Sequence, residues 1–479
     1  MGCSALGCKK ATNLDSISSN NNLYQINLTL SEDLKTVSAN QTVYFCNQTD
    51  NVLKTIKFQL YPKFFMEDNL DYVVDSTNLA NAFPNGKNFA TFNLNRTKID
   101  NSDTTPTFSG VCNNILEINL TSSLLPDQKT EIYFEYDFVL PCMNHRFGFG
   151  ENTINIANFY PVLCVFENGE FCCNPYNSNG DPFYSDMANY EVNFSYPSNL
   201  TVAHTGEKTS SRTLGDTLQD SYSAKMVRDF AIVASKKFET ISKKAGKTQV
   251  NYFYTKDDNS DKSLSAGVDA INTFEKLFGE YPYPEFNIAQ TDFVYGGMEY
   301  PNLVLISNQI TDLDNYLNVI IHETAHQWWY GLVGNNEFEH PWLDESLTEF
   351  STLLFYDNNT GYNLNHSEMI KGYTKNYTLF VDVYQQVFKE LDTSMRAVDK
   401  YPTQPEYTYC IYVKGTLMWQ SLFELVGEKK FVTSLKNYYN ENRFKNATPT
   451  DLENCFSTYC KQDLSGFFSS WINGKVVIR

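Results

Sequence analysis

The chain has 479 residues, of which 42% are hydrophobic, 15% aromatic and 19% charged. This length predicts about two to four domains, and the composition is typical of a globular protein rather than a disordered or low-complexity chain. With 56 acidic residues against 37 Lys and Arg, the formal net charge is −19. This charge argues against nucleic acid and anionic membrane surfaces as partners and favours cationic ligands, such as peptides with a free amino terminus.

The first 20 residues, MGCSALGCKKATNLDSISSN, lack the apolar stretch of a secretory signal, and no apolar run approaches the roughly 20 residues of a membrane-spanning helix. We therefore expect a disordered segment over 1–20, no integral membrane segment and, by default, a cytoplasmic location. A cell-surface or secreted location would follow if the N-terminus were truncated or lipidated. The 11 cysteines include no CxxC pair, which predicts mostly reduced thiols and no cysteine-based zinc site.

Residues 21–229 show a period of two. Tyr24, Ile26 and Leu28 alternate with polar residues, and similar runs recur between clusters of Asn, Asp, Gly and Pro. Alternation of this kind is typical of half-buried strands, so we expect an N-terminal antiparallel, saddle-like β domain.

Residues 230–479 change to helical spacing after a last strand at 250–254. The expected helices of this half cover 264–278, 317–330, 344–356, 415–425, 429–440 and 450–460, and two strands at 287–295 and 302–307 flank the loop GGMEYP. The fold class predicted for the whole chain is therefore multidomain α+β, with a mostly helical second domain that contains a small β-sheet.

The strongest chemical signal is His-Glu-x-x-His at His322, Glu323 and His326. Two imidazoles at i and i+4 lie one turn apart on one helix face, where both can bind a single Zn²⁺ at about 2.0 to 2.1 Å. The carboxylate of Glu323, on the same turn, could reach a water on that metal. This pattern predicts one zinc per chain and hydrolytic chemistry.

A catalytic zinc needs a third protein ligand. Glu345 lies nineteen residues after His326, where Pro341 and Asp344 indicate the start of a new helix, and a helix packed antiparallel to the first would bring it to the metal. On spacing alone, His340 and Asp344 are rival ligands. Glu349, one turn beyond Glu345, could orient a ligand imidazole, or it could be an exposed glutamate.

HETAHQWWYG followed by WLDES resembles the M1 family of zinc aminopeptidases, gluzincins with a thermolysin-like catalytic domain. The family pattern is H-E-x-x-H, eighteen residues, then E, with a G-x-M-E-N loop upstream; here GGMEY stands at 296–300. The resemblance extends over most of the chain and implies that 230–479 is a thermolysin-like zinc peptidase domain. It also implies Glu345 as the third ligand.

The same resemblance implies that Gly296, Gly297, Met298 and Glu299 bind substrate. In the family this glutamate holds the free α-amino group of the peptide, which makes the enzyme an exopeptidase. Glycines at the first two positions allow close approach of a peptide backbone. Tyr300 replaces the usual Asn of the motif.

A tyrosine in a Y-x-K-G context stabilises the oxyanion in the family, and Tyr412 matches it, with Tyr407 and Tyr409 as rivals. The family's amine-binding motif in the N-terminal domain is not found, although Glu151 could supply a carboxylate. The sequence stops at Arg479, so the C-terminal helical domain of the family is expected to be absent from it.

The predicted function is zinc-dependent aminopeptidase activity, with Glu323 as general base and Tyr412 stabilising the oxyanion. The expected substrates are peptides with a free N-terminus. Two alternatives are a thermolysin-like endopeptidase and a non-catalytic binding scaffold of the same fold. The oligomeric state and the preferred first residue of the substrate are not predicted.

Overall fold

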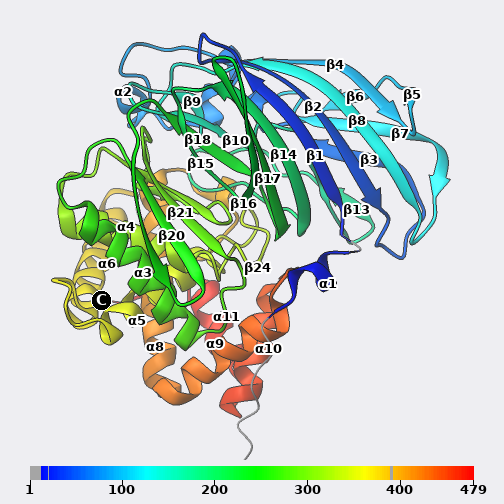
Figure 1. The fold of residues 1–479 in the computed structure, drawn as a ribbon. Coiled ribbons are helices and arrows are strands. Elements are labelled where there is room, and N and C mark those ends of the chain that lie inside the picture. Colours follow the sequence, from blue (N-terminus) through cyan, green and yellow to red (C-terminus); the bar gives the residue numbers. More distant parts are fainter. Residues whose placement is uncertain (1–11, 20, 389–391, 479) are drawn as a thin grey trace, which may run out of the picture.

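The computed structural model describes residues 12–19, 21–388 and 392–478. An N-terminal β domain is followed by a second domain of helices around a five-stranded sheet (Figure 1), which confirms the predicted α+β fold class. Strand β18 (Ala231–Ser235) still pairs within the first domain, whereas β19 (Glu239–Ala245) pairs within the second. The chain thus passes from the first domain to the second between Ser235 and Glu239. This point lies a few residues after the predicted boundary at 229/230.

The largest sheet of the N-terminal domain has eight strands. Its order is β16 (Glu207–Leu214), β17 (Thr217–Val227), β14 (Ala188–Pro197), β1 (Leu23–Leu30), β2 (Thr36–Cys46), β8 (Lys129–Val139), β4 (Thr91–Ile99) and β5 (Ser102–Asp103). Its described pairings are antiparallel except that β1 runs parallel to β14. In β2 and β8 every second side chain is buried, because successive side chains of a strand point to opposite faces.

Smaller sheets complete this domain. One sheet has the order β15 (Thr201–His204), β18, β10 (Ile154–Ala157) and β9 (Phe147–Phe149), and another has β11 (Val162–Leu163), β3 (Leu53–Gln59), β7 (Ile115–Leu124) and β6 (Thr107–Ser109). A separate hairpin joins β12 (Val165–Glu167) to β13 (Glu170–Cys172). Short helical turns, η1 (Tyr61–Phe65), η2 (Glu67–Tyr72) and α2 (Leu79–Ala82), follow β3.

The sheet of the second domain positions the GGMEY loop. Its order is β19, β20 (Thr248–Tyr254), β21 (Glu285–Thr291), β23 (Leu303–Ser307) and β22 (Gly297–Met298), with the three middle strands parallel. The edge strand β22 is antiparallel to β23. Helix α3 (Ser260–Leu277) packs on β19 and β20, and α4 (Leu313–Ala325) packs against α3, β22 and β23. The edge strand therefore lies directly beside α4.

Helix α4 ends earlier than predicted. His326 is its C-terminal cap and keeps helical angles (φ −60°, ψ −17°), whereas Tyr330 has φ +131°. This conformation cannot continue a helix, so the chain turns away after His326 and the predicted end at residue 330 is wrong. The i, i+4 relation of His322 and His326 is unaffected.

The remaining helices pack around α4. They are α5 (Glu345–Asn358), α6 (His366–Phe388), α7 (Gln404–Thr408), α8 (Lys414–Val426), α9 (Glu428–Asn442), α10 (Pro449–Cys460) and α11 (Ser465–Ile472), with the 3₁₀ turn η3 (Val398–Lys400) and the π-helical turn η4 (Tyr409–Val413). Strands β24 (Val333–Gly334) and β25 (Lys445–Asn446) form a short pair. Helix α5 packs on both α4 and α8. It therefore lies between these two helices.

Part of the segment predicted as disordered is a helix. Residues 1–11 and 20 lie outside the described residues, but α1 (Leu14–Ser18) follows Asn13, whose side chain accepts a hydrogen bond from the backbone of Ser16. Thr12 donates to Glu280 (2.7 Å) and accepts from Arg443 (3.0 Å). These bonds fix the segment against the second domain, near α10 (Figure 1).

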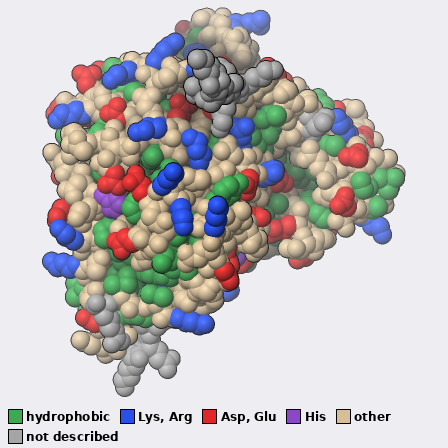
Figure 2. Space-filling view, turned by 90° about the horizontal axis from the view of Figure 1, so that it is seen from below, with side chains coloured by type: hydrophobic (Ala, Val, Ile, Leu, Met, Phe, Trp, Pro, Cys, Tyr) green, Lys and Arg blue, Asp and Glu red, His purple; other side chains and the backbone are tan. Residues whose placement is uncertain are grey.

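Within the described part of the chain, we find no helix that has both the length and the apolar character needed to cross a bilayer. On the face shown in Figure 2, acidic and basic side chains are mixed, and apolar side chains gather at the lower left of the view.

Candidate metal and peptide site

Helices α4 and α5 bring His322, His326 and Glu345 to one point. The Nε2 atoms of the two histidines lie 3.2 Å apart, and Glu345 Oε2 lies 3.2 Å from Nε2 of His326 and 3.6 Å from Nε2 of His322. Tetrahedral Zn²⁺ with bonds of about 2.0 to 2.1 Å separates its ligand atoms by about 3.3 Å. The three ligand atoms therefore already have the spacing that this ion requires.

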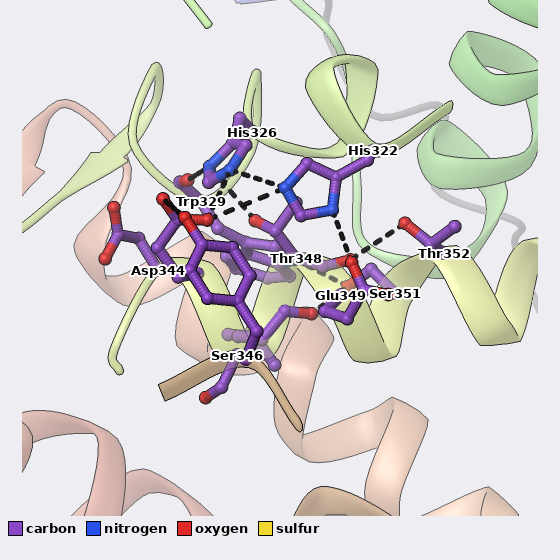
Figure 3. A network of polar contacts seen from close by, with 12 residues as sticks. His322, His326, Trp329, Asp344, Ser346, Thr348, Glu349, Ser351 and Thr352 are labelled. Carbon is purple, nitrogen blue, oxygen red and sulfur yellow. Dashed lines mark hydrogen bonds and ion pairs between the residues drawn. The ribbon is translucent and has the colours of Figure 1, made fainter. Parts of the chain in front are cut away.

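The other nitrogen of each imidazole is held by the protein. His322 Nδ1 lies 2.7 Å from Glu349 Oε2, and the hydroxyl of Tyr373 donates to the same carboxylate. His326 Nδ1 lies 2.9 Å from the carbonyl oxygen of Trp329. These contacts turn both Nε2 atoms toward a common point (Figure 3), an orientation typical of metal ligands. Glu349 is thus half-buried against His322 rather than exposed.

The two rival ligands are placed differently. The side chain of His340 is absent from the groups of potential ligand atoms found in the described residues. Asp344 does approach His326 and Glu299, within 4.8 Å, but its carboxylate accepts a hydrogen bond from Asn335 (3.3 Å) and does not line the cavity. Of the three candidates for the third ligand, Glu345 is the one whose carboxylate lies close to both imidazoles.

Glu345 and the two imidazoles shift one another's pKa values in opposite directions. Although burial opposes it, the imidazoles of His326 and His322 lower the pKa of Glu345. Burial would lower the pKa of His326, but Glu299 and Glu345 raise it to about 10. The carboxylates of Glu299 and Glu345 thus favour positive charge at this point of the cavity.

Glu323 lies beside the candidate metal ligands. Its side chain is 6% exposed, and its Oε2 has no hydrogen-bond partner in the parts of the chain that the structure describes. Burial raises its pKa to about 7. A buried carboxylate with a free oxygen and a pKa near neutrality can accept a proton from water.

The GGMEY loop lies against Glu323. A Cβ atom at Gly297 would lie 2.3 Å from Glu323 Oε1, whereas at Gly296 the nearest atom would be Val319 Cγ2 at 3.9 Å. Glycine is thus required only at the second position, for a close contact with a side chain. Met298 does not line the cavity, contrary to the prediction, because alternation along β22 turns it into the core, where it is fully buried.

Glu299 faces the same cavity. It is 3% exposed, its Oε1 is unpartnered among the described residues, and burial raises its pKa. The side chain of Gln327 bonds the carbonyl oxygen of Tyr300 (3.2 Å) and accepts from the backbone of Asn302 (2.9 Å). Gln327 directly follows His326, so it fixes the loop relative to the metal ligands.

Tyr300, the departure from the family motif, points away from the cavity. Its ring is fully buried and its hydroxyl donates to Asn158 Oδ1 (2.5 Å). Asn158 in turn bonds Asp229. The replacement therefore ties the loop to the N-terminal domain without narrowing the space beside Glu299.

Tyr412 lies on the π-helical turn η4, and its hydroxyl donates to Glu345 Oε1. Single-turn π-helices occur frequently at functional sites. Burial raises the pKa of Tyr412, so the phenol stays protonated. Of the rivals, Tyr409 stacks on Phe380 away from the cavity, whereas Tyr407 lines the cavity with its hydroxyl unpartnered among the described residues.

These groups share a cavity of about 430 Å³. Two of its residues were missed by the sequence analysis, Asp181 and Arg146, which form an ion pair with the arginine buried. The carboxyl of Asp181 lies within 4.8 Å of those of Glu299 and Glu345. Glu151, the candidate from the sequence, is 85% exposed on the surface near Lys237. No motif or spacing distinguishes Asp181, which occurs in the loop NSNGDP.

A β domain is followed by a helical domain that presents His-Glu-x-x-His from α4 and a glutamate from α5, the arrangement that the sequence resemblance implies. Residues 263–471 match the model of the peptidase family M1 domain. This part of the chain is therefore similar to the peptidase family M1 domain.

Solved structures share the whole fold. The M1 zinc metallopeptidase from Deinococcus radiodurans superposes with a TM-score of 0.66 at 14% identity, over 96% of both chains. A structure of a mutant of the M1 zinc metallopeptidase from Deinococcus radiodurans bound to a Tyr-Ser-Ala substrate gives a TM-score of 0.65 over 96% of this chain and 97% of that one.

Curated relatives match less than half of this chain. Leucine aminopeptidase 2 of Neosartorya fischeri is 29% identical over 198 residues, which are 40% of this chain and 31% of that protein. Aminopeptidase N of Lactococcus lactis subsp. lactis is 24% identical over 245 residues, 47% of this chain and 28% of that protein. The match thus spans less than a third of the length of these relatives.

Proposed function

We propose that this protein is a zinc-dependent aminopeptidase that removes single residues from the free amino termini of peptides. The observation that carries the proposal is Glu299 Oε1, which has no hydrogen-bond partner among the described residues and lies beside the His322–His326–Glu345 group in one cavity. The M1 domain and the aminopeptidase names of the relatives support the same function.

His322, His326 and Glu345 would hold the zinc. Bound there, Zn²⁺ would supply Lewis acidity that activates water and polarises a carbonyl group. The donor set supports zinc because two imidazoles and one carboxylate are the ligands of many catalytic zinc sites, with a position left open.

Glu323 would act as general base and then as general acid. Its free Oε2 takes the proton of the attacking water and delivers it to the leaving amine. Tyr412 would donate its hydroxyl proton in a hydrogen bond to the developing oxyanion, exchanging its present bond to Glu345 for one to the substrate.

Three carboxyl groups would bind the amino terminus. Oxygens of Asp181, Glu299 and Glu345 lie within 4.8 Å of one another, so a protonated amine could contact all three. Anchoring this amine at one fixed distance from the metal ligands selects the first peptide bond. A blocked amine would leave a buried carboxylate unpaired, which costs about 1 to 3 kcal/mol or more.

One peptide in two forms, free and N-acetylated, tests the proposal, with products identified by mass spectrometry. We expect stepwise trimming of the free form and little cleavage of the acetylated form, both abolished by a zinc chelator. Internal cleavage of the acetylated peptide at a similar rate would instead support the thermolysin-like endopeptidase. No cleavage of either form would support the non-catalytic scaffold.

The matched variants for this test are Glu299→Ala and Glu151→Ala. We expect Glu299→Ala to lower kcat/KM for free-amine peptides by about tenfold or more, from the loss of the charge-assisted contact, while zinc content stays at one equivalent. Glu151 is exposed and outside the cavity, so its variant should behave like wild type. Equal losses in both variants would contradict the assignment.

The two glycines give a sharper prediction about Glu323. We expect Gly297→Ala to lower kcat by about 10²-fold or more, because the added methyl group must displace the Glu323 carboxylate. Gly296→Ala, whose Cβ would meet only Val319 Cγ2 at an ordinary van der Waals distance of 3.9 Å, should keep near-normal kcat. Steady-state kinetics with thermal unfolding as a folding control check this pair, and similar kcat values for both would show that the close contact is not needed.

A further inference from the structure

A pair of cysteines lies on the hairpin β12–β13. Val165 pairs with Cys172 and Glu167 with Glu170, so the next opposed pair beyond the ladder is Cys164 and Cys173. Their Sγ atoms lie 2.8 Å apart, closer than the roughly 3.6 Å at which two sulfur atoms touch. Cys164 is 4% exposed and Cys173 is partly exposed.

The turn of the hairpin determines whether Cys164 and Cys173 are a hydrogen-bonded or a non-hydrogen-bonded pair. Asn168 and Gly169 both have positive φ (52° and 89°), as in a two-residue type I′ turn. The pair that flanks such a turn is hydrogen-bonded, and hydrogen-bonded and non-hydrogen-bonded pairs then alternate. Cys164 and Cys173 are therefore a non-hydrogen-bonded pair, with Cα atoms about 4.5 Å apart, inside the range of about 4.4 to 6.8 Å for disulfides.

The adjacent Cys172 is turned the other way. Successive side chains of a strand point to opposite faces, and Cys172 accepts from Asn336 Nδ2 (3.6 Å) and contacts Asn174 Oδ1 (3.4 Å). Its sulfur thus faces the second domain, while that of Cys173 faces Cys164.

We propose that Cys164 and Cys173 form a cross-strand disulfide when the protein meets a low-molecular-weight disulfide such as oxidised glutathione. The more exposed Cys173 thiolate attacks the disulfide and releases one thiol, leaving a mixed disulfide. The Cys164 thiolate then attacks the Cys173 sulfur and releases the second thiol. Two protein thiols are oxidised, one external disulfide is reduced to two thiols, and the two protons go to the released thiolates.

Electrostatics agree with this order of attack. The hydrogen bond with Cys164 lowers the pKa of Cys173, despite its burial, whereas burial raises the pKa of Cys164. The thiolate of Cys173 is therefore the more available nucleophile.

The bond would restrain the wall of the candidate site. Residues 174–182, here called the cavity loop, follow Cys173 directly, and Asn177, Gly180 and Asp181 of this loop line the cavity. The loop is bonded to both domains, through Gln59 to the carbonyl oxygen of Asn174 (2.9 Å) and from Asn179 to Tyr401 (2.9 Å). A covalent link to Cys164 would fix Cys173, the residue from which this loop starts.

Peptide mapping of the full chain tests the pairing. The protein is incubated with oxidised glutathione or with a reductant, alkylated with N-ethylmaleimide in denaturant, and cut after glutamate. Glu167 and Glu170 then separate Cys164 from Cys172 and Cys173. We expect a linked peptide pair only after oxidation, in wild type and in Cys172→Ser, and none in Cys164→Ser or Cys173→Ser.

Two results would overturn the pairing. One is alkylation of both Cys164 and Cys173 in the oxidised wild type, and the other is a linked pair that survives in Cys173→Ser but is lost in Cys172→Ser. Hydrogen–deuterium exchange of the cavity loop tests the restraint. Slower exchange in the oxidised protein than in the reduced one is expected, and equal exchange would refute it.

Discussion

Replacing Glu323 with glutamine is expected to lower kcat for peptide hydrolysis by about 10²-fold to 10⁴-fold. The amide is nearly isosteric with the carboxylate but cannot accept the proton of the attacking water. The buried Oε2 of Glu323 has no partner in the described structure, so the substitution removes proton transfer without breaking a structural hydrogen bond at that atom. Zinc content and the melting temperature should therefore stay close to those of wild type.

Glu151→Gln is the matched control, because it makes the same chemical change at a glutamate that is 85% exposed. Steady-state kinetics and metal analysis of both variants separate the two effects. If Glu323→Gln retained near-normal kcat, the proton would have to be taken by another group. If it lost zinc as well as activity, Glu323 would instead help to bind the metal.

The second large effect concerns the metal ligands. The double variant His322→Ala and His326→Ala should lose stoichiometric zinc and, with it, measurable hydrolysis, because only Glu345 of the three ligands remains. Metal analysis after dialysis, at equal protein concentration, measures this loss. His340→Ala supplies the control, since this histidine lies outside the ligand group and its loss should leave one equivalent of zinc.

A full equivalent of zinc in the double variant would show that the metal is bound elsewhere. Loss of zinc in His340→Ala would reopen the choice of ligands that spacing alone left undecided. The double variant also removes two imidazoles that contact Glu345 and Glu349, so its circular dichroism spectrum should be compared with that of wild type before the zinc content is interpreted.

The second domain was easier to predict than the details of its site. Helix periodicity placed α3, α5, α8, α9 and α10 to within a few residues. Helix α6 was missed. No local pattern in the sequence signals that α4 ends at Ala325 or that Tyr330 takes a positive φ.

The sequence by itself predicted the candidate metal ligands His322 and His326. A spacing of four residues on a helix places His322 and His326 on one face whatever surrounds them, since helix geometry is local. It also indicated a β domain at 21–229, because alternation of apolar and polar residues reports burial on one face of a sheet.

Only the tertiary structure decided how the site is completed. Helix packing placed Glu345 rather than His340 at the ligand group. The fold of the N-terminal domain brought Asp181, more than a hundred residues before Glu299, to the same cavity, and left Glu151 on the surface. Contacts between segments so distant in sequence depend on the packing of the domains, and neither periodicity nor motif spacing carries that information.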